Sequence, residues 1–257
     1  CRPAVDTPLA SMVNDEDRRT SVIALILAAA LAQVAEVQAD APDDRLAQLV
    51  ERGSPEERRR AMHLLAERKA EGAVALIARV AEAAETDLVT RQMAVSCLAS
   101  LRDRAAIPTL LKLLRSDVVP DLTFRQYVAD RLAEWTHQCV PFFVFDARTD
   151  PPESKKIEDA SVNSWMTWWL EDRGKTEAEW IDRGIARAID LLDSPDDAVR
   201  GLAIAHLKAQ TDLDFDFDPQ AEPAAHGEAL RRWERWWVEN RSHIRWDPEL
   251  GRLVTEP

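Results

Sequence analysis

The sequence predicts an all-α protein, an α-solenoid of stacked helix pairs with two tryptophan-bearing helical insertions. Three observations predict this fold class. Alanine, leucine, glutamate and arginine dominate the 257 residues, and only 7 are glycine, a composition that favours helices. A motif of an acidic turn, an arginine and an apolar helix recurs along the middle of the chain. A second motif, which holds most of the 9 tryptophans, occurs twice.

Four segments carry the first motif. They begin at Ser54, Thr86, Asp121 and Ser194, and their aligned arginines are Arg59, Arg91, Arg125 and Arg200. The last spacing is about twice the others, which indicates an inserted element. In the first and last segments a serine precedes Pro55 or Pro195, so we expect a capping hydroxyl followed by proline at the first helical position.

Each of the second helices expected at 73–84 and 105–114 has apolar residues along one face, the pattern of an amphipathic helix. Such helix pairs cannot bury their apolar faces alone and stack into a solenoid. These residues resemble HEAT repeats over about 43–210, most clearly at 194–207 and 103–111. The resemblance implies a long binding surface made of successive helices. The last two units depart from the family because they carry long insertions.

The insertions hold the second motif. Its first copy is Thr136, Phe143, Phe145, Asp146, Trp165, Trp168, Trp169 and Arg173, and its second is Thr211, Phe215, Phe217, Asp218, Trp233, Trp236, Trp237 and Arg241. The spacing puts the three tryptophans of each copy on one helical face. We expect them to be core, and the arginine one turn later to make a cation–π contact. The Phe-x-Phe segments read as short extended pieces with buried rings. The appendages span about 136–174 and 211–246.

The chain starts at Cys1, and a polar stretch follows. We expect residues 1–17 to be a tether and 18–257 one domain. A first cysteine resembles a mature bacterial lipoprotein, which implies an acylated Cys1, membrane attachment only through that lipid, and a place on the periplasmic side of the cell envelope. If Cys1 is an arbitrary boundary, a cytoplasmic location follows. The apolar run 22–35 is too short to cross a bilayer, which takes about 20 residues, and predicts a buried helix.

Several kinds of site are disfavoured. The formal net charge of -13 opposes a phosphate backbone, so we expect no nucleic-acid partner. The aspartates between Asp212 and Asp218 alternate as in a calcium loop, but Phe217 and Pro223 occupy the positions that need glycine and glutamate. The 5 histidines form no metal-binding pair, and no nucleophile motif is present. We therefore expect no catalytic residue, cofactor or metal. A disulfide between Cys97 and Cys139 stays open.

The sequence as a whole favours a non-catalytic protein-binding or scaffolding role, as a subunit or adaptor of a larger envelope-associated complex. An acidic surface favours a partner with basic patches. Trp180 and Trp246, which lie outside the two copies of the tryptophan motif, are the predicted partner contacts. The alternative is a HEAT-type lyase or an enzyme accessory protein. A deep pocket with converging polar groups would favour the enzyme, and a broad groove would favour the scaffold.

Overall fold

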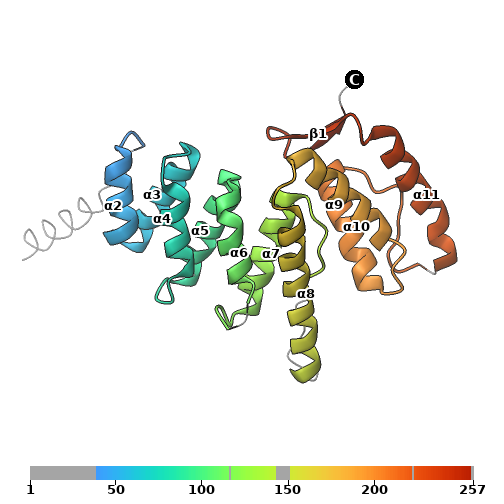
Figure 1. Ribbon diagram of the computed structural model, residues 1–257, viewed down its shortest axis with the longest axis horizontal. Helices are drawn as coiled ribbons and strands as arrows, with labels where there is room; N and C mark the ends of the chain where they lie inside the picture. The colour runs from blue at the N-terminus through green and yellow to red at the C-terminus, as the bar shows by residue number, and fades with distance from the viewer. Residues whose placement is uncertain (1–38, 116, 143–150, 222, 256–257) are drawn as a thin grey trace, which may run out of the picture. The chain divides into compact units, whose positions relative to one another are not determined.

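The computed structural model describes residues 39–115, 117–142, 151–221 and 223–255 (Figure 1). The chain divides into a unit of residues 1–41 and a unit of residues 42–257, and the second is described below. Cys1, the expected tether and the expected helix at 22–35 lie outside the described residues. In the described part of the chain, no helix is both long and apolar enough to span a membrane.

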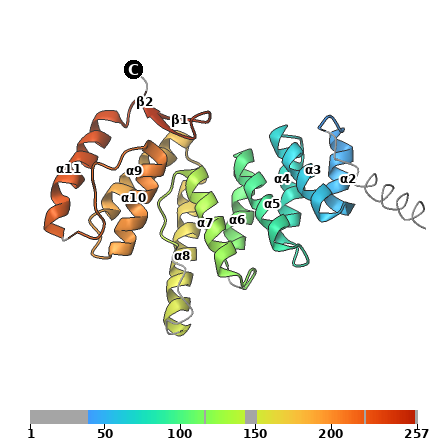
Figure 2. The same cartoon turned by 180° about the vertical axis from the view of Figure 1, so that it is seen from behind.

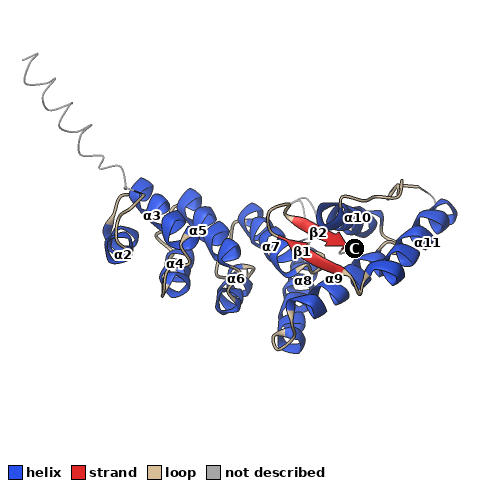
Figure 3. Ribbon diagram, turned by 90° about the horizontal axis from the view of Figure 1, so that it is seen from above, coloured by secondary structure: helices blue, strands red, loops and turns tan. Residues whose placement is uncertain are grey.

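The first half of the unit consists of paired helices. The pairs are α2 (Asp43–Arg52) with α3 (Pro55–Glu67), α4 (Ala73–Glu82) with α5 (Leu88–Leu101), and α6 (Ile107–Leu113) with α7 (Leu122–Thr136). A short 3-10 helix, η1 (Arg104–Ala106), leads into α6. Helix α3 packs on α5 and α5 on α7, while α2 packs on α4 and α4 on α6. The first and second helices of the pairs therefore form two separate rows (Figure 3).

The second half adds α8 (Pro151–Asp172), α9 (Glu177–Leu191), α10 (Asp197–Thr211) and α11 (Pro223–Asn240). Helices α9 and α10 lie between α8 and α11 in both views (Figures 1 and 2). The chain then forms a hairpin of β1 (Ile244–Asp247) and β2 (Arg252–Thr255), which was not predicted. These two strands are the whole β-structure of the described residues, and β2 packs on α10. The all-α solenoid prediction is confirmed.

The predicted helix starts are confirmed at one proline and wrong at the other. The Ser54 hydroxyl accepts from the backbone N–H of Glu57 at 3.3 Å, and the Glu57 carboxylate accepts from the Ser54 N–H at 2.8 Å. Pro195, however, lies in a turn. The Ser194 hydroxyl accepts from the Asp196 N–H at 3.2 Å, and the Asp196 carboxylate then caps α10 by accepting an N–H of its first turn at 2.9 Å. Asp196, and not Ser194, is therefore the N-cap of α10.

The aligned arginines tie each second helix to a neighbouring element. Arg59 donates to a hydroxyl of α5 at 3.0 Å. Arg125 is buried and pairs with Glu158 of α8 at 2.5 Å. Arg91 and Arg200 donate to backbone carbonyls just before their own helices, at 2.6 and 2.7 Å. Because the residue repeats while its partner changes, the same side chain holds together regular repeats and the inserted α8.

The two tryptophan triplets, here called the first box (Trp165, Trp168, Trp169) and the second box (Trp233, Trp236, Trp237), share one internal geometry. Their first two rings meet edge to face, with centroids 5.6 Å apart in both boxes and interplanar angles of 89° and 87°. Trp165 and Trp233 are both 0% exposed. The core assignment is therefore confirmed for them, while Trp236 is half-buried.

The boxes differ in what covers them. Trp180 of α9 packs on the first box, with its ring centroid 5.4 Å from that of Trp168. In the second box Phe215 packs edge to face on Trp233 at 4.8 Å. The predicted cation–π partner Arg241 instead pairs with Asp182 at 3.7 Å.

The Phe-x-Phe segment at 215–217 is not extended, contrary to the prediction. Phe215 and Asp216 adopt left-handed φ angles of 50° and 58°. The Asp214 carboxylate accepts from the Asp216 N–H at 3.1 Å, and the Asp214 carbonyl accepts from the Phe217 N–H at 3.1 Å. The alternating aspartates thus form a tight turn, and Phe217 still becomes buried. The matching Phe143, Phe145 and Asp146 lie outside the described residues.

Replacing a box tryptophan tests the core assignment. We expect Trp165→Ala and Trp233→Ala each to lower the free energy of unfolding by roughly 3–5 kcal/mol. Trp236 is half-buried, so Trp236→Ala should lower the free energy of unfolding clearly less. Val238, which is 74% exposed on the same helix α11, provides the control in Val238→Ala. Chemical denaturation of the four variants measures the effect. Equal losses at Trp233 and Val238 would contradict the assignment.

Candidate functional site

A cavity of about 490 Å³ lies between α7, residues 138–142, α10 and the C-terminal hairpin. A second hollow of about 340 Å³ is lined by α5, α7 and the hairpin. Trp246 and Gly251 line both, so the hairpin lies over the row of second helices with a hollow on each side. The larger cavity falls within the range of roughly 300–1,000 Å³ that is typical of small-molecule sites.

The end of α7 leads directly into the segment 138–142, which lines the cavity. Helix α7 ends at Thr136, and His137 takes a left-handed φ of 61° that turns the chain into a buried segment. Helix α9 comes very close to this turn, because a Cβ built on Gly184 would lie 1.8 Å from the His137 carbonyl oxygen. Only glycine permits this approach. The second motif copy repeats the helix end: Thr211 bonds back to the helix as Thr136 does, and Asp212 has a φ of 63°.

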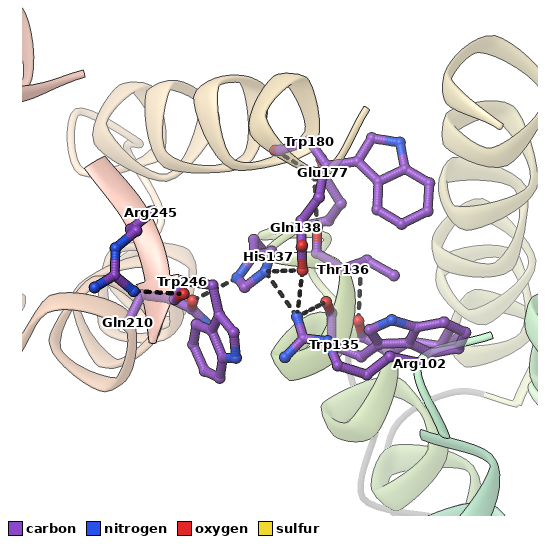
Figure 4. Close-up of polar contacts among 11 residues, drawn as sticks. Arg102, Trp135, Thr136, His137, Gln138, Glu177, Trp180, Gln210, Arg245 and Trp246 are labelled. Carbon is purple, nitrogen blue, oxygen red and sulfur yellow. Dashed lines mark hydrogen bonds and ion pairs between the residues drawn. The ribbon is translucent and has the colours of Figure 1, made fainter. Parts of the chain in front are cut away.

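A polar network fills the junction between these helices (Figure 4). The Arg102 Nη2 group, at the end of α5, donates to the Trp135 carbonyl and to His137 Nε2, both at 3.0 Å, and to Glu177 at 2.9 Å. Its two hydrogens are therefore shared among three acceptors. On the other side of the ring, His137 Nδ1 lies 2.8 Å from the Gln210 Oε1 of α10. The network thus joins α5, α7, α9 and α10.

The directions of these bonds follow from the arginine. A guanidinium can only donate, so His137 Nε2 accepts and Nδ1 carries the hydrogen. Gln210 Oε1 then accepts that hydrogen. His137 is 0% exposed, and both of its ring nitrogens are thereby satisfied.

Gln138 and His206 also line the larger cavity, and one side-chain nitrogen of each donates to a backbone carbonyl. The Gln138 amide nitrogen donates to the Thr136 carbonyl at 3.0 Å and to the Trp180 carbonyl at 2.8 Å. His206 Nε2 donates to the His137 carbonyl at 3.2 Å. Burial lowers the pKa of His206 to about 4, so its ring is neutral and Nδ1 is an acceptor near neutral pH.

The two predicted partner contacts have different environments. Trp180 is 2% exposed, and its indole N–H donates to the Asp172 carbonyl at 2.8 Å. The structure therefore gives Trp180 a core position under Arg104, whose guanidinium lies 4.2 Å from the ring centroid. Trp246 is half-buried and lies over the junction. Its ring is 4.9 Å from that of His137, and the Arg102 guanidinium is 4.8 Å from it. Its indole N–H is buried with no acceptor among the described residues.

No side chain of the cavity has the marks of an activated nucleophile. Cys139 lines it, but burial raises the pKa of this thiol to about 12, so the thiolate is not formed. Burial also raises the pKa of the Cys97 thiol to about 12. Cys97 and Cys139 are both free thiols, so they do not form the disulfide that the sequence left open. Within the described ranges, no group of three His, Cys, Asp or Glu side chains is placed to hold a metal ion.

Sequence reasoning missed the junction residues Arg102, His137, Gln138, His206 and Gln210. Each has the sequence context of an ordinary polar residue of a helix or loop, and the contacts that join them span up to 73 residues along the chain. One signal was available: the aligned pair Thr136 and Thr211 marked two equivalent helix ends, and the residue after each is the one that reaches an arginine.

Acid should weaken the fold through His206. Its native pKa is about 4 against a usual 6.5, so the unfolded chain takes up a proton between these values that the native state excludes. The stabilisation is therefore full above about pH 6.5 and is lost as the pH falls towards 4, by at most about 3 kcal/mol. His206→Gln, which keeps a donor for the His137 carbonyl, should flatten this dependence in pH-dependent denaturation. The exposed His63→Gln is the control, and an equal slope in both variants would contradict the assignment.

The comparisons with known proteins agree with this architecture. A family model described as HEAT repeats matches residues 42–130, which hold α2 to α6 and the first part of α7. No curated protein and no solved structure matched the chain. HEAT repeats are in general a scaffold fold for protein interaction. The chain therefore contains HEAT repeats, at residues 42–130.

Proposed function

We propose that this protein binds other proteins as a non-catalytic scaffold or adaptor, through the face formed by the second helices α5, α7 and α10. The observation that carries the proposal is the pair of hollows of about 340 and 490 Å³ on this face, one on each side of the hairpin. Successive second helices give HEAT stacks an extended surface for partners. Here that surface is polar at α5, where Ser96 and Ser100 line the smaller hollow.

The charge of this face indicates what kind of partner fits. Asp130 and Glu134 are exposed on α7 and line the larger cavity. Glu134 pairs with Arg131 at 2.7 Å. Asp130 accepts from the Gln126 amide at 2.8 Å and forms no ion pair with a residue that the structure describes. Together with the net charge of -13, this favours a partner with a basic patch.

The lyase alternative finds less support. The larger cavity does gather polar groups, which is a feature expected of an enzyme. These groups are amides, a neutral histidine and the charged side chains of Asp130, Arg131 and Glu134, and the thiol of Cys139 among them has a pKa of about 12. A binding role accounts for such groups without a reactive centre.

Charge reversal tests the proposed surface. We expect Asp130→Lys with Glu134→Lys to reduce stoichiometric partners recovered with the tagged full-length protein by at least about tenfold, because like charges then face each other. Glu239→Lys on α11 reverses one charge at an exposed site that lines neither hollow, and should leave recovery unchanged, while Asp130→Lys alone provides the comparison at equal charge. Quantitative mass spectrometry measures the recovery. Equal loss in both variants, or in neither, would count against this face.

The narrower expectation, an adaptor in an assembly of the cell envelope, belongs to the same proposal and depends on a lipid on Cys1. Intact-mass analysis of the protein isolated from its native cells should show the added mass of acyl chains on a fragment that contains Cys1. Cys1→Ser should release the protein from the membrane fraction. An unmodified cysteine would remove the envelope part and leave the protein-binding part standing.

A further inference from the structure

We propose that the cavity beneath the hairpin is a binding site for a small neutral molecule that carries a primary carboxamide on an apolar ring. The cavity belongs to the face proposed to bind partners, but the residues that carry this inference, Gln138, His206 and Gln210, differ from the exposed carboxylates Asp130 and Glu134 that carry the partner proposal. Three polar atoms of its lining residues carry the inference: Gln210 Nε2, Gln138 Oε1 and His206 Nδ1.

Each of the three atoms has a fixed hydrogen-bonding sense. Gln210 Oε1 accepts from His137, so its Nε2 remains as a donor. Gln138 Nε2 donates to two carbonyls, so its Oε1 remains as an acceptor. His206 Nε2 donates to a carbonyl, so its Nδ1 remains as a second acceptor. None of the three atoms bonds to a residue that the structure describes. All three residues line the cavity, and Gln138 also lines a neighbouring hollow beside α8 and α9.

The cavity therefore offers one donor and two acceptors. A primary carboxamide has the inverse set, namely one oxygen that accepts and two N–H groups that donate. A carboxylate lacks the two donors and would face Asp130 and Glu134 on the cavity wall, where Arg131 is already paired with Glu134. An ammonium group lacks the acceptor that Gln210 Nε2 needs. The hydrogen-bonding inventory thus selects a neutral amide over either charged group.

Apolar and aromatic groups define the rest of the ligand. Val140 and Phe142 are 4% and 2% exposed, and with Leu202 and Trp246 they give the cavity apolar walls. A volume of about 490 Å³ admits a ring with its substituents. Gln138 and Gln210 are each 2% exposed, and leaving such amides unpaired beside a ligand is costly. The site should consequently reject ring compounds that lack the amide.

The binding experiment uses benzamide as the probe with the full-length chain. Ligand-observed NMR titration measures binding of benzamide, of benzoate and of acetophenone, which keeps the ring and the carbonyl but has no N–H. We expect benzamide to bind at least about tenfold more tightly than either analogue. No binding of benzamide, or equal binding of acetophenone, would overturn the proposal.

A matched pair of variants places the binding in this cavity. Ala205 is exposed on α10 and lines the cavity, so Ala205→Trp fills it without disturbing the core. Ala198 is an equally exposed alanine near the start of α10 that does not line it, so Ala198→Trp is the control. Ala205→Trp should abolish benzamide binding and keep the unfolding midpoint of the control. Unchanged binding in Ala205→Trp would overturn the assignment of this cavity.

Discussion

A helix pair with one apolar face cannot stand alone, and this constraint governs the whole described unit. Each pair from α2 to α7 buries its apolar side only because the next pair covers it. The aligned arginines add polar ties across the same boundaries, at α5 through Arg59 and at α8 through Arg125. Where the regular pairs give way to longer elements, the same need is met by other means. Tryptophan helices and a hairpin take over the covering role.

The junction at His137 shows how the two halves are joined. Regular repeats end with α7, and the chain must turn inward without leaving buried polar groups unpaired. Arg102 solves this on one side of the His137 ring and Gln210 on the other, so every polar atom of the imidazole has a partner. Trp246 then lies against the ring with centroids 4.9 Å apart and an interplanar angle of 56°, and its N–H has no acceptor among the described residues. The hairpin is thus held by this aromatic contact, by the packing of β2 on α10 and by the ion pair of Arg252 with Asp212.

How much could be predicted from the sequence depended on the range of the interactions. The spacing of apolar residues gave the helix pairs, because helical periodicity is local, and the duplicated tryptophans gave the two equivalent boxes. Two predictions were wrong because a nearby aspartate formed a different local hydrogen bond. Asp196 caps α10 in place of Ser194, and Asp214 forms a tight turn at Phe215 in place of an extended segment. The hairpin was missed because each strand has only four residues, and the alternation of Ile244 and Trp246 with polar residues in β1 is too short to predict a strand. The cavity was missed because Gln138, His206 and Gln210 meet only through the fold.

The packing of α9 against the end of α7 depends on the absence of a Cβ atom at Gly184. The chain could place almost any small residue at this point of α9 without harming the helix itself, and alanine would be the better helix former. The neighbouring carbonyl of His137 excludes alanine, because the methyl group would overlap the carbonyl oxygen. Widening that contact would shift α9 away from the end of α7 and separate the Trp180 carbonyl from the Gln138 amide that it holds. The position of α9 relative to the end of α7 is therefore set by a contact between two backbone segments, at Gly184 and His137. No side chain takes part in this contact, so the residue type at position 184 is its one mark in the sequence.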